Sequence, residues 1–121
     1  MKPRILIIDD DPNNCELIQL MLQNSNPDYE ITGVISPEEG LRLAETQRFD
    51  LYVIDYRLGG ITGIDVCRAL RGADGDTRIM FFTGEEHERV RQEAMQAGAD
   101  AYLLKPNHLK NLTETVTRLL G

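Results

Sequence analysis

The chain has 121 residues and a formal net charge of −7, from 20 acidic against 13 basic residues. This length fits one domain with one hydrophobic core, and we expect residues 1–121 to form a single domain without a linker. The negative charge is of the wrong sign for wrapping nucleic acid or lying on an anionic membrane, so we expect neither as a direct partner.

Apolar runs of strand length alternate with segments of helical period along the chain. Asp11 before Pro12 predicts the start of the first helix, with Asp11 as its N-cap, and Ser36 before Pro37 predicts the start of the second. Gly98 is placed to end the fourth helix in a left-handed conformation. The predicted strands are 4–8, 30–34, 51–54, 79–82 and 101–104, and the predicted helices are 12–26, 36–47, 62–72, 86–98 and 107–121.

Strict alternation of five strands with five helices is typical of a parallel sheet that is covered on both faces. We therefore predict an α/β fold, a three-layer sandwich around a doubly wound five-stranded parallel sheet. In such sheets, ligands bind outside the carboxyl ends of the strands. Polar residues stand at those ends, and we expect them to converge: Asp9, Asp10 and Asp11 after the first strand, Asp55 after the third, Thr83 after the fourth and Lys105 after the fifth.

The two cysteines, Cys15 and Cys67, have no CxxC spacing and no His or Cys placed to complete a zinc site. Both lie in predicted helices, so we expect buried free thiols. The first apolar run follows Met1, Lys2 and Pro3 directly, without a charged and then apolar leader or a long apolar span. These features predict a soluble protein of the cytoplasm.

The segments around the strand ends read IIDDD, VIDYRLGGITG, FFTG and YLLKP. With these motifs, the chain resembles the receiver domain of two-component response regulators over essentially its whole length. The resemblance implies a flavodoxin-like sheet with the strand order 2-1-3-4-5. It also implies a phosphoacceptor signalling switch that assists its own phosphorylation and dephosphorylation, rather than an enzyme.

By this resemblance, Asp55 takes a phosphoryl group from a phosphohistidine of a histidine kinase or histidine phosphotransfer protein. Asp9, Asp10 and Asp55 form an acidic pocket for Mg²⁺, a hard cation that favours oxygen ligands. Asp10 contacts the metal directly and Asp9 often acts through water. The backbone carbonyl of Arg57 is the remaining protein ligand.

The same resemblance gives Thr83 and Lys105 the hydroxyl and the ammonium that bind phosphoryl oxygens. Pro106 matches a proline that follows the lysine through a cis bond. Tyr102 occupies an aromatic switch position, whose ring fills space that Thr83 vacates. The resulting change in the surface of the fourth helix, fifth strand and fifth helix is the signal to a downstream effector or output domain.

Several positions depart from the family pattern or vary within it. Gly59 stands where proline is usual, which predicts a more mobile loop. Arg57 and Glu85 stand where a bridge over the phosphoryl group would slow its hydrolysis, although two solvated side chains are the alternative. His87 and His108 have no partners at ligand spacing and are predicted to be solvated.

Other functions fit the residues less well. A flavin carrier needs a phosphate-binding loop after the first strand, where three aspartates would repel phosphate. A hydrolase with an aspartyl-phosphate intermediate carries a second aspartate where Arg57 stands. A receiver-like interaction module without phosphotransfer remains the alternative, as does the question of whether the chain acts alone or is part of a longer protein.

Overall fold

The computed structural model describes residues 2–106 and 108–121, and within them it contains one parallel sheet. The strand order is β2-β1-β3-β4-β5, which confirms the predicted fold. The strands are β1 (Arg4–Ile8), β2 (Glu30–Val34), β3 (Leu51–Ile54), β4 (Arg78–Thr83) and β5 (Ala101–Leu104). The α-helices are α1 (Pro12–Ser25), α2 (Pro37–Thr46), α3 (Gly63–Ala73), α4 (Glu88–Gln96) and α5 (Leu112–Leu120).

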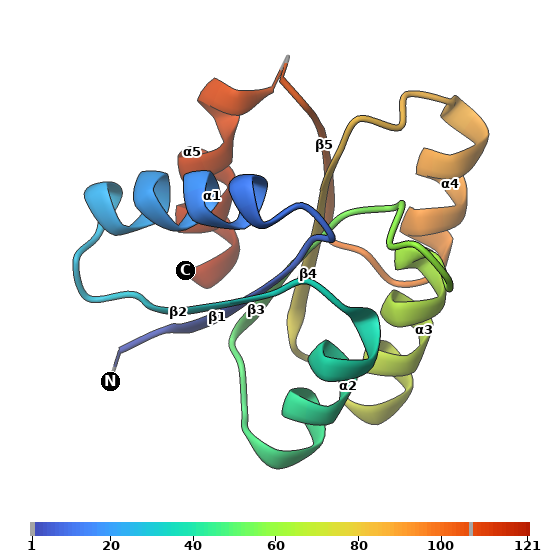
Figure 1. Cartoon of the computed structure of the whole chain (residues 1–121), viewed down its shortest axis with the longest axis horizontal. Helices are drawn as coiled ribbons and strands as arrows, with labels where there is room; N and C mark the ends of the chain where they lie inside the picture. The colour runs from blue at the N-terminus through green and yellow to red at the C-terminus, as the bar shows by residue number, and fades with distance from the viewer. Residues whose placement is uncertain (1, 107) are drawn as a thin grey trace.

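The helices cover the two faces of the sheet, with α1 and α5 on one face and α2, α3 and α4 on the other (Figure 1). Along β1, Ile5 and Ile7 pack on the α1 and α5 side, while Leu6 and Ile8 pack on the opposite side. All four side chains are fully buried. Burial on both faces explains why the central strands are continuous apolar runs rather than alternating ones.

The predicted helix boundaries are confirmed where local hydrogen bonds set them. The Asp11 side chain accepts a hydrogen bond from the Asn13 N–H at 2.9 Å, and the Ser36 hydroxyl accepts one from the Glu39 N–H at 3.1 Å. Gly98 follows α4 with φ = +111°, in the left-handed region where glycine is favoured. The two cysteines are free and buried, also as predicted.

Two helix starts differ from the prediction. The fourth helix begins at Glu88 rather than at residue 86, because the backbone N–H of His87 donates to the Glu85 carboxylate at 3.3 Å and His87 is extended. A short 3-10 helix, Leu109–Asn111, precedes α5, where a single helix from residue 107 was expected. Asn107 lies outside the described residues.

The prediction that His108 is solvated is wrong. Its ring nitrogen Nδ1 accepts a hydrogen bond from the backbone N–H of Leu104 at 2.9 Å, and this bond joins the 3-10 helix to the end of β5. The bond between Lys105 and Pro106, which the sequence left open, is cis, as in the pattern that Pro106 matches. Among the described residues, none of the helices is both long enough and apolar enough to span a bilayer.

Candidate functional site at the carboxyl edge of the sheet

The predicted site residues meet at the carboxyl ends of four neighbouring strands. Ile8 of β1 pairs with Ile54 of β3, so Asp9 and Asp55 leave the sheet at the same level. The backbone N–H of Asp55 donates to the Ile8 carbonyl at 3.0 Å. On the other side, the N–H of Lys105 donates to the Thr83 carbonyl at 2.8 Å, which fixes the end of β5 beside the end of β4.

Three carboxylates form the centre of the site. Asp9, Asp10 and Asp55 each offer an oxygen, and these oxygens lie within 4.8 Å of one another. Asp9 is buried, Asp55 is half-buried and Asp10 is exposed, so the cluster opens towards solvent on one side. Clustered carboxylate oxygens on an open edge have the chemistry that a hard divalent cation requires.

Lys105 is the cation within this cluster. Its ammonium nitrogen lies 2.6 Å from Asp9 Oδ2 and 3.2 Å from Asp55 Oδ2. Burial lowers the pKa of Lys105, but the hydrogen bonds and charges of the two aspartates outweigh it and raise the pKa above its ordinary value. One ammonium therefore faces three carboxylates, which leaves an excess of negative charge.

Asp9 is the most buried of the three carboxylates. Burial raises its pKa above the ordinary value, and the Asp55 charge acts in the same direction, although Lys105 and the Asp11 N–H act against them. A carboxylate held in this way is costly to ionise. A further cation near Asp9, Asp10 and Asp55 would relieve that cost, so the residues present fit a divalent metal.

Thr83 is buried, with its hydroxyl next to the Asp55 carboxylate. The backbone N–H of Tyr56 donates to Asp55 Oδ1 at 2.7 Å and, more weakly, to Thr83 Oγ1 at 3.4 Å. The N–H of Glu85 also donates to Thr83 Oγ1, at 3.3 Å. Both contacts use the oxygen as an acceptor, and within the described residues its proton has no acceptor. The Thr83 hydroxyl proton is therefore available to donate a hydrogen bond to an incoming group.

Gly63, the first residue of α3, fixes the distance between this helix and β3. Its N–H donates to the Tyr56 carbonyl at 2.8 Å. A Cβ at this position would lie 2.2 Å from the Asp55 carbonyl oxygen and 2.9 Å from Phe81 Cε2. Only glycine allows the helix to begin this close to Asp55. Gly63 is the last residue of the segment VIDYRLGGITG, and the sequence gave no physical reason for a glycine there.

The rim of the site contains an ion pair rather than two solvated side chains. Arg57 Nη2 lies 2.8 Å from Glu85 Oε2, and the Arg57 side chain is 76% exposed whereas that of Glu85 is 5% exposed. His87 Nδ1 contacts the other Glu85 oxygen, and the His87 side chain is 79% exposed, so the prediction that His87 is solvated is confirmed although Glu85 is a partner that was not foreseen. Hydrogen bonds from His87, and then the Arg57 charge, hold the pKa of Glu85 below its usual range.

Two further predictions concern the rim. Gly59 has φ = +77°, which glycine adopts and proline cannot, so this chain departs here from the usual proline, and the greater mobility of the loop stays a prediction. The role of the Arg57 carbonyl as a metal ligand stays a prediction.

Tyr102 connects β5 to the rim. Its hydroxyl donates to the Glu85 carbonyl at 2.6 Å. Its ring stacks on Phe81, with ring centroids 5.6 Å apart and an interplanar angle of 24°. Burial, followed by the Glu85 charge, raises the pKa of Tyr102 to about 12, so the phenol is a neutral donor. The aromatic ring and the loop after Thr83 are therefore in direct contact.

Comparison with known protein families gives one match that covers most of the chain. Residues 5–117 match the response regulator receiver domain. The chain is 34% identical to the DNA-binding response regulator MtrA of Mycolicibacterium smegmatis over 96% of this chain and 50% of that protein. It is 32% identical to the alkaline phosphatase synthesis transcriptional regulatory protein PhoP of Bacillus subtilis, over 99% and 49% respectively. The chain spans about half the length of these curated relatives.

Solved structures agree with this match. A CheY-like receiver domain protein of Methanospirillum hungatei superposes with a TM-score of 0.92 at 27% identity, over 99% of this chain and 94% of that one. The response regulator protein TrrA of Thermotoga maritima, solved in complex with Mg²⁺ and BeF, gives a TM-score of 0.87 at 32% identity, over 97% and 98%.

Proposed function

The chain belongs to the response regulator receiver domain family of two-component systems, and on that basis we propose that Asp55 is its phosphoacceptor. The donor is a phosphohistidine on a histidine kinase or histidine phosphotransfer protein. The observation that carries this assignment is the position of the Asp55 carboxylate, 3.2 Å from the Lys105 ammonium and within 4.8 Å of the other two carboxylates.

In the transfer, the phosphorus–nitrogen bond of the donor breaks as an Asp55 oxygen bonds to phosphorus, which produces an acyl phosphate and a free imidazole. The negative charge on the phosphoryl oxygens needs positive partners. The Lys105 ammonium and the Thr83 hydroxyl stand beside Asp55 and serve as those partners. The backbones of these two residues are joined at the strand ends, where the N–H of Lys105 donates to the Thr83 carbonyl at 2.8 Å.

The metal in this proposal is Mg²⁺, held by Asp9, Asp10, Asp55 and the backbone carbonyl of Arg57. When bound, it supplies positive charge to the phosphoryl oxygens. The support from this chain is the imbalance of three carboxylates against one ammonium and the raised pKa of Asp9.

The output in this proposal is a change in the surface of α4, β5 and α5. Thr83 and Tyr102 both contact Glu85, so a shift of Thr83 towards a phosphoryl group alters the environment of the ring. A downstream effector or an output domain reads this surface. Residues 1–121 act as one receiver domain, either alone or within a longer protein such as the DNA-binding relatives.

The test is the mass of the intact protein after incubation with acetyl phosphate, with and without Mg²⁺. We expect one phosphoryl group on the wild type with Mg²⁺, and none on Asp55→Asn. Asp76→Asn, which changes an exposed aspartate away from the site, is the matched control and should be phosphorylated like the wild type. A folded wild type without any adduct would instead support a receiver-like interaction module that lacks phosphotransfer.

A further inference from the structure

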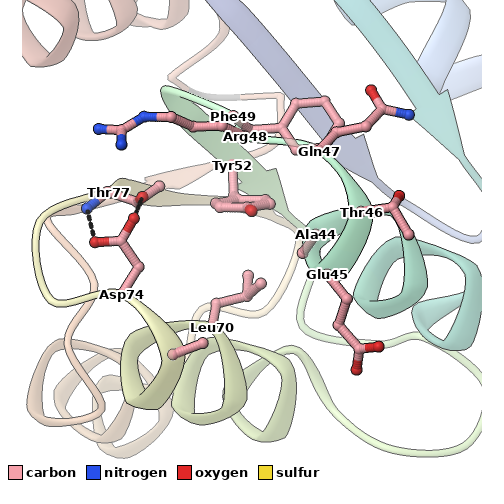
Figure 2. Close-up of a pocket in the computed structure, with 11 residues that line it drawn as sticks. Ala44, Glu45, Thr46, Gln47, Arg48, Phe49, Tyr52, Leu70, Asp74 and Thr77 are labelled. Carbon is pink, nitrogen blue, oxygen red and sulfur yellow. Dashed lines mark hydrogen bonds between the residues drawn. The ribbon is translucent and has the colours of Figure 1, made fainter.

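A cavity of about 350 Å³ lies at the amino-terminal edge of the sheet, opposite to the edge that carries Asp55. It is open to solvent on one side and is lined by the end of α2, the start of β3 and the end of α3 (Figure 2). Phe49, Tyr52 and Leu70 form its apolar walls, and Arg48, Asp74 and Thr77 lie at its rim. This volume is within the range of small-molecule sites.

The Tyr52 hydroxyl lacks a hydrogen-bond partner among residues 2–106 and 108–121. The residue is only 5% exposed, and its ring lies in the middle of the lining residues (Figure 2). Phe49 tilts against it at 59°, with ring centroids 5.7 Å apart. Burial, with the Asp74 charge, raises the pKa of the phenol, so it stays a neutral donor. Tyrosine hydroxyls usually find a partner, and this one is open to the cavity, because within residues 2–106 and 108–121 no fully buried side-chain oxygen lacks a hydrogen-bond partner.

Asp74 supplies a fixed negative charge at the rim. Its carboxylate accepts from the Thr77 hydroxyl, from the Asp76 N–H at 2.8 Å and from the Thr77 N–H at 3.3 Å. These donors hold the pKa of Asp74 below its usual range, so the group is ionised. A carboxylate has about four acceptor sites, which leaves one of them, on Oδ2, for a ligand. Glu45 and Asp74 outnumber Arg48 in the lining, so the cavity favours a cation.

We propose that this cavity binds a small aromatic amine that carries a hydroxyl group. The ring lies against Phe49, Tyr52 and Leu70, the ammonium pairs with Asp74, and the ligand hydroxyl accepts the hydrogen bond that Tyr52 offers. The site is independent of phosphorylation at Asp55.

The first measurement is a titration of the ¹⁵N-labelled chain with tyramine, followed by backbone amide shifts. We expect saturable shifts at Tyr52, Asp74 and Thr77, with a dissociation constant in the millimolar range. 4-Hydroxyphenylacetate has the same ring and hydroxyl with a negative charge, and it should not shift these amides. Equal binding of this anion would overturn the proposal, and so would an absence of saturable shifts with tyramine.

Variants test the two polar contacts separately. Tyr52→Phe should bind tyramine about three- to tenfold more weakly, and Asp74→Asn about tenfold more weakly, as expected for lost neutral and charged hydrogen bonds. Phenethylamine lacks the ligand hydroxyl, so it should bind the wild type and Tyr52→Phe equally. Tyr29→Phe, at an equally buried tyrosine outside the cavity, and Asp76→Asn should leave the affinity for tyramine unchanged. Tyramine binding that is insensitive to both Tyr52→Phe and Asp74→Asn contradicts the assignment.

Discussion

Two clusters of charged residues stand at opposite edges of the sheet, and they differ in how their charges are balanced. At the amino-terminal edge, Arg71 donates to the carbonyls of Gly98 and Thr77, at 2.7 and 2.6 Å, and to Asp100 Oδ2 at 3.2 Å. Asp100 also accepts from the Ile79 N–H at 2.9 Å and pairs with Arg78 at 3.7 Å. Two arginines thus pair with the one carboxylate of Asp100, and each of these three side chains has a partner of opposite charge.

At the carboxyl edge, Lys105 is, within the described residues, the one cation that pairs with Asp9 and Asp55, and Asp10 adds a third carboxylate to the cluster. Both edges combine basic and acidic side chains, but at the carboxyl edge the negative charge is in excess and one side is open to solvent. A balanced network joins elements of the fold, whereas an unbalanced and open one has a place for a ligand. The balance of charge, more than the presence of charged residues, separates the structural cluster from the site.

Breaking the balanced cluster should have the largest effect on stability. Arg71→Met removes the cation that ties α3 to the loops before β4 and β5, and leaves Asp100 and two carbonyls with fewer donors. We expect a loss of about 2–3 kcal/mol in the free energy of unfolding, measured with urea. At low temperature, the folded variant should still be phosphorylated at Asp55. Loss of phosphorylation in folded protein would contradict the division into two clusters.

The same substitution should act in opposite directions at the two edges. Asp9→Asn removes a buried carboxylate whose pKa is raised by folding, so its ionisation at neutral pH costs more in the folded than in the unfolded state, and without Mg²⁺ we expect a gain of about 1 kcal/mol in stability. Asp100→Asn removes the partner of two arginines and should cost about 1–2 kcal/mol. Thermal unfolding of both variants, without metal, measures the signs, and equal signs would refute this comparison.

Magnesium should stabilise only a chain whose acidic cluster is intact. At ten times its dissociation constant, a ligand that binds the folded state alone adds about 1.4 kcal/mol. We expect a rise of this size in the wild type and in Arg71→Met, measured by thermal unfolding. Asp10→Asn should show none, and Ca²⁺-free and Mg²⁺-free buffer with chelator provides the baseline. A similar rise in Asp10→Asn would place the metal elsewhere.

The smallest effect concerns the rim. Arg57 pairs with Glu85 near Asp55, the proposed phosphoacceptor, and we expect Arg57→Ala to shorten the lifetime of the phosphoryl group about two- to fivefold, within the range for exposed ion pairs. The decay of phosphorylated protein after removal of the donor measures it. Arg42→Ala, at an exposed arginine of α2, is the matched control. An unchanged lifetime in Arg57→Ala would show that the pair does not shield the phosphoryl group.

Much of the fold could be predicted because local signals and burial agree. The five strands are within one residue of their predicted bounds at each end, since each is an apolar run bounded by polar residues. The convergence of Asp9, Asp55 and Lys105 followed from the rule that parallel strands end at one edge. The helix starts at Pro12 and Pro37 followed from their capping residues.

What could not be predicted depends on partners distant in the chain. In the sequence, Arg71 cannot be told apart from any other basic residue near the end of a helix. Its acceptors Gly98 and Asp100 lie 27 and 29 positions further along the chain. The residues next to His108 in the sequence are typical of a protein surface, yet its ring accepts a hydrogen bond from the backbone N–H of Leu104 at the end of β5. The start of α4 at Glu88 depends on the Glu85 carboxylate, whose burial is a tertiary effect. No spacing in the sequence reports these contacts.

The pairing of Lys105 with Asp9 and Asp55 also bears on how the protein is made. Lys105 follows Asp55 by 50 positions and Asp9 by 96. A nascent chain that has not yet reached residue 105 has all three carboxylates and no ammonium to oppose them. The repelling charges are thus translated first and their counter-charge last, so a chain still on the ribosome has no complete phosphoryl site until its fifth strand has been added.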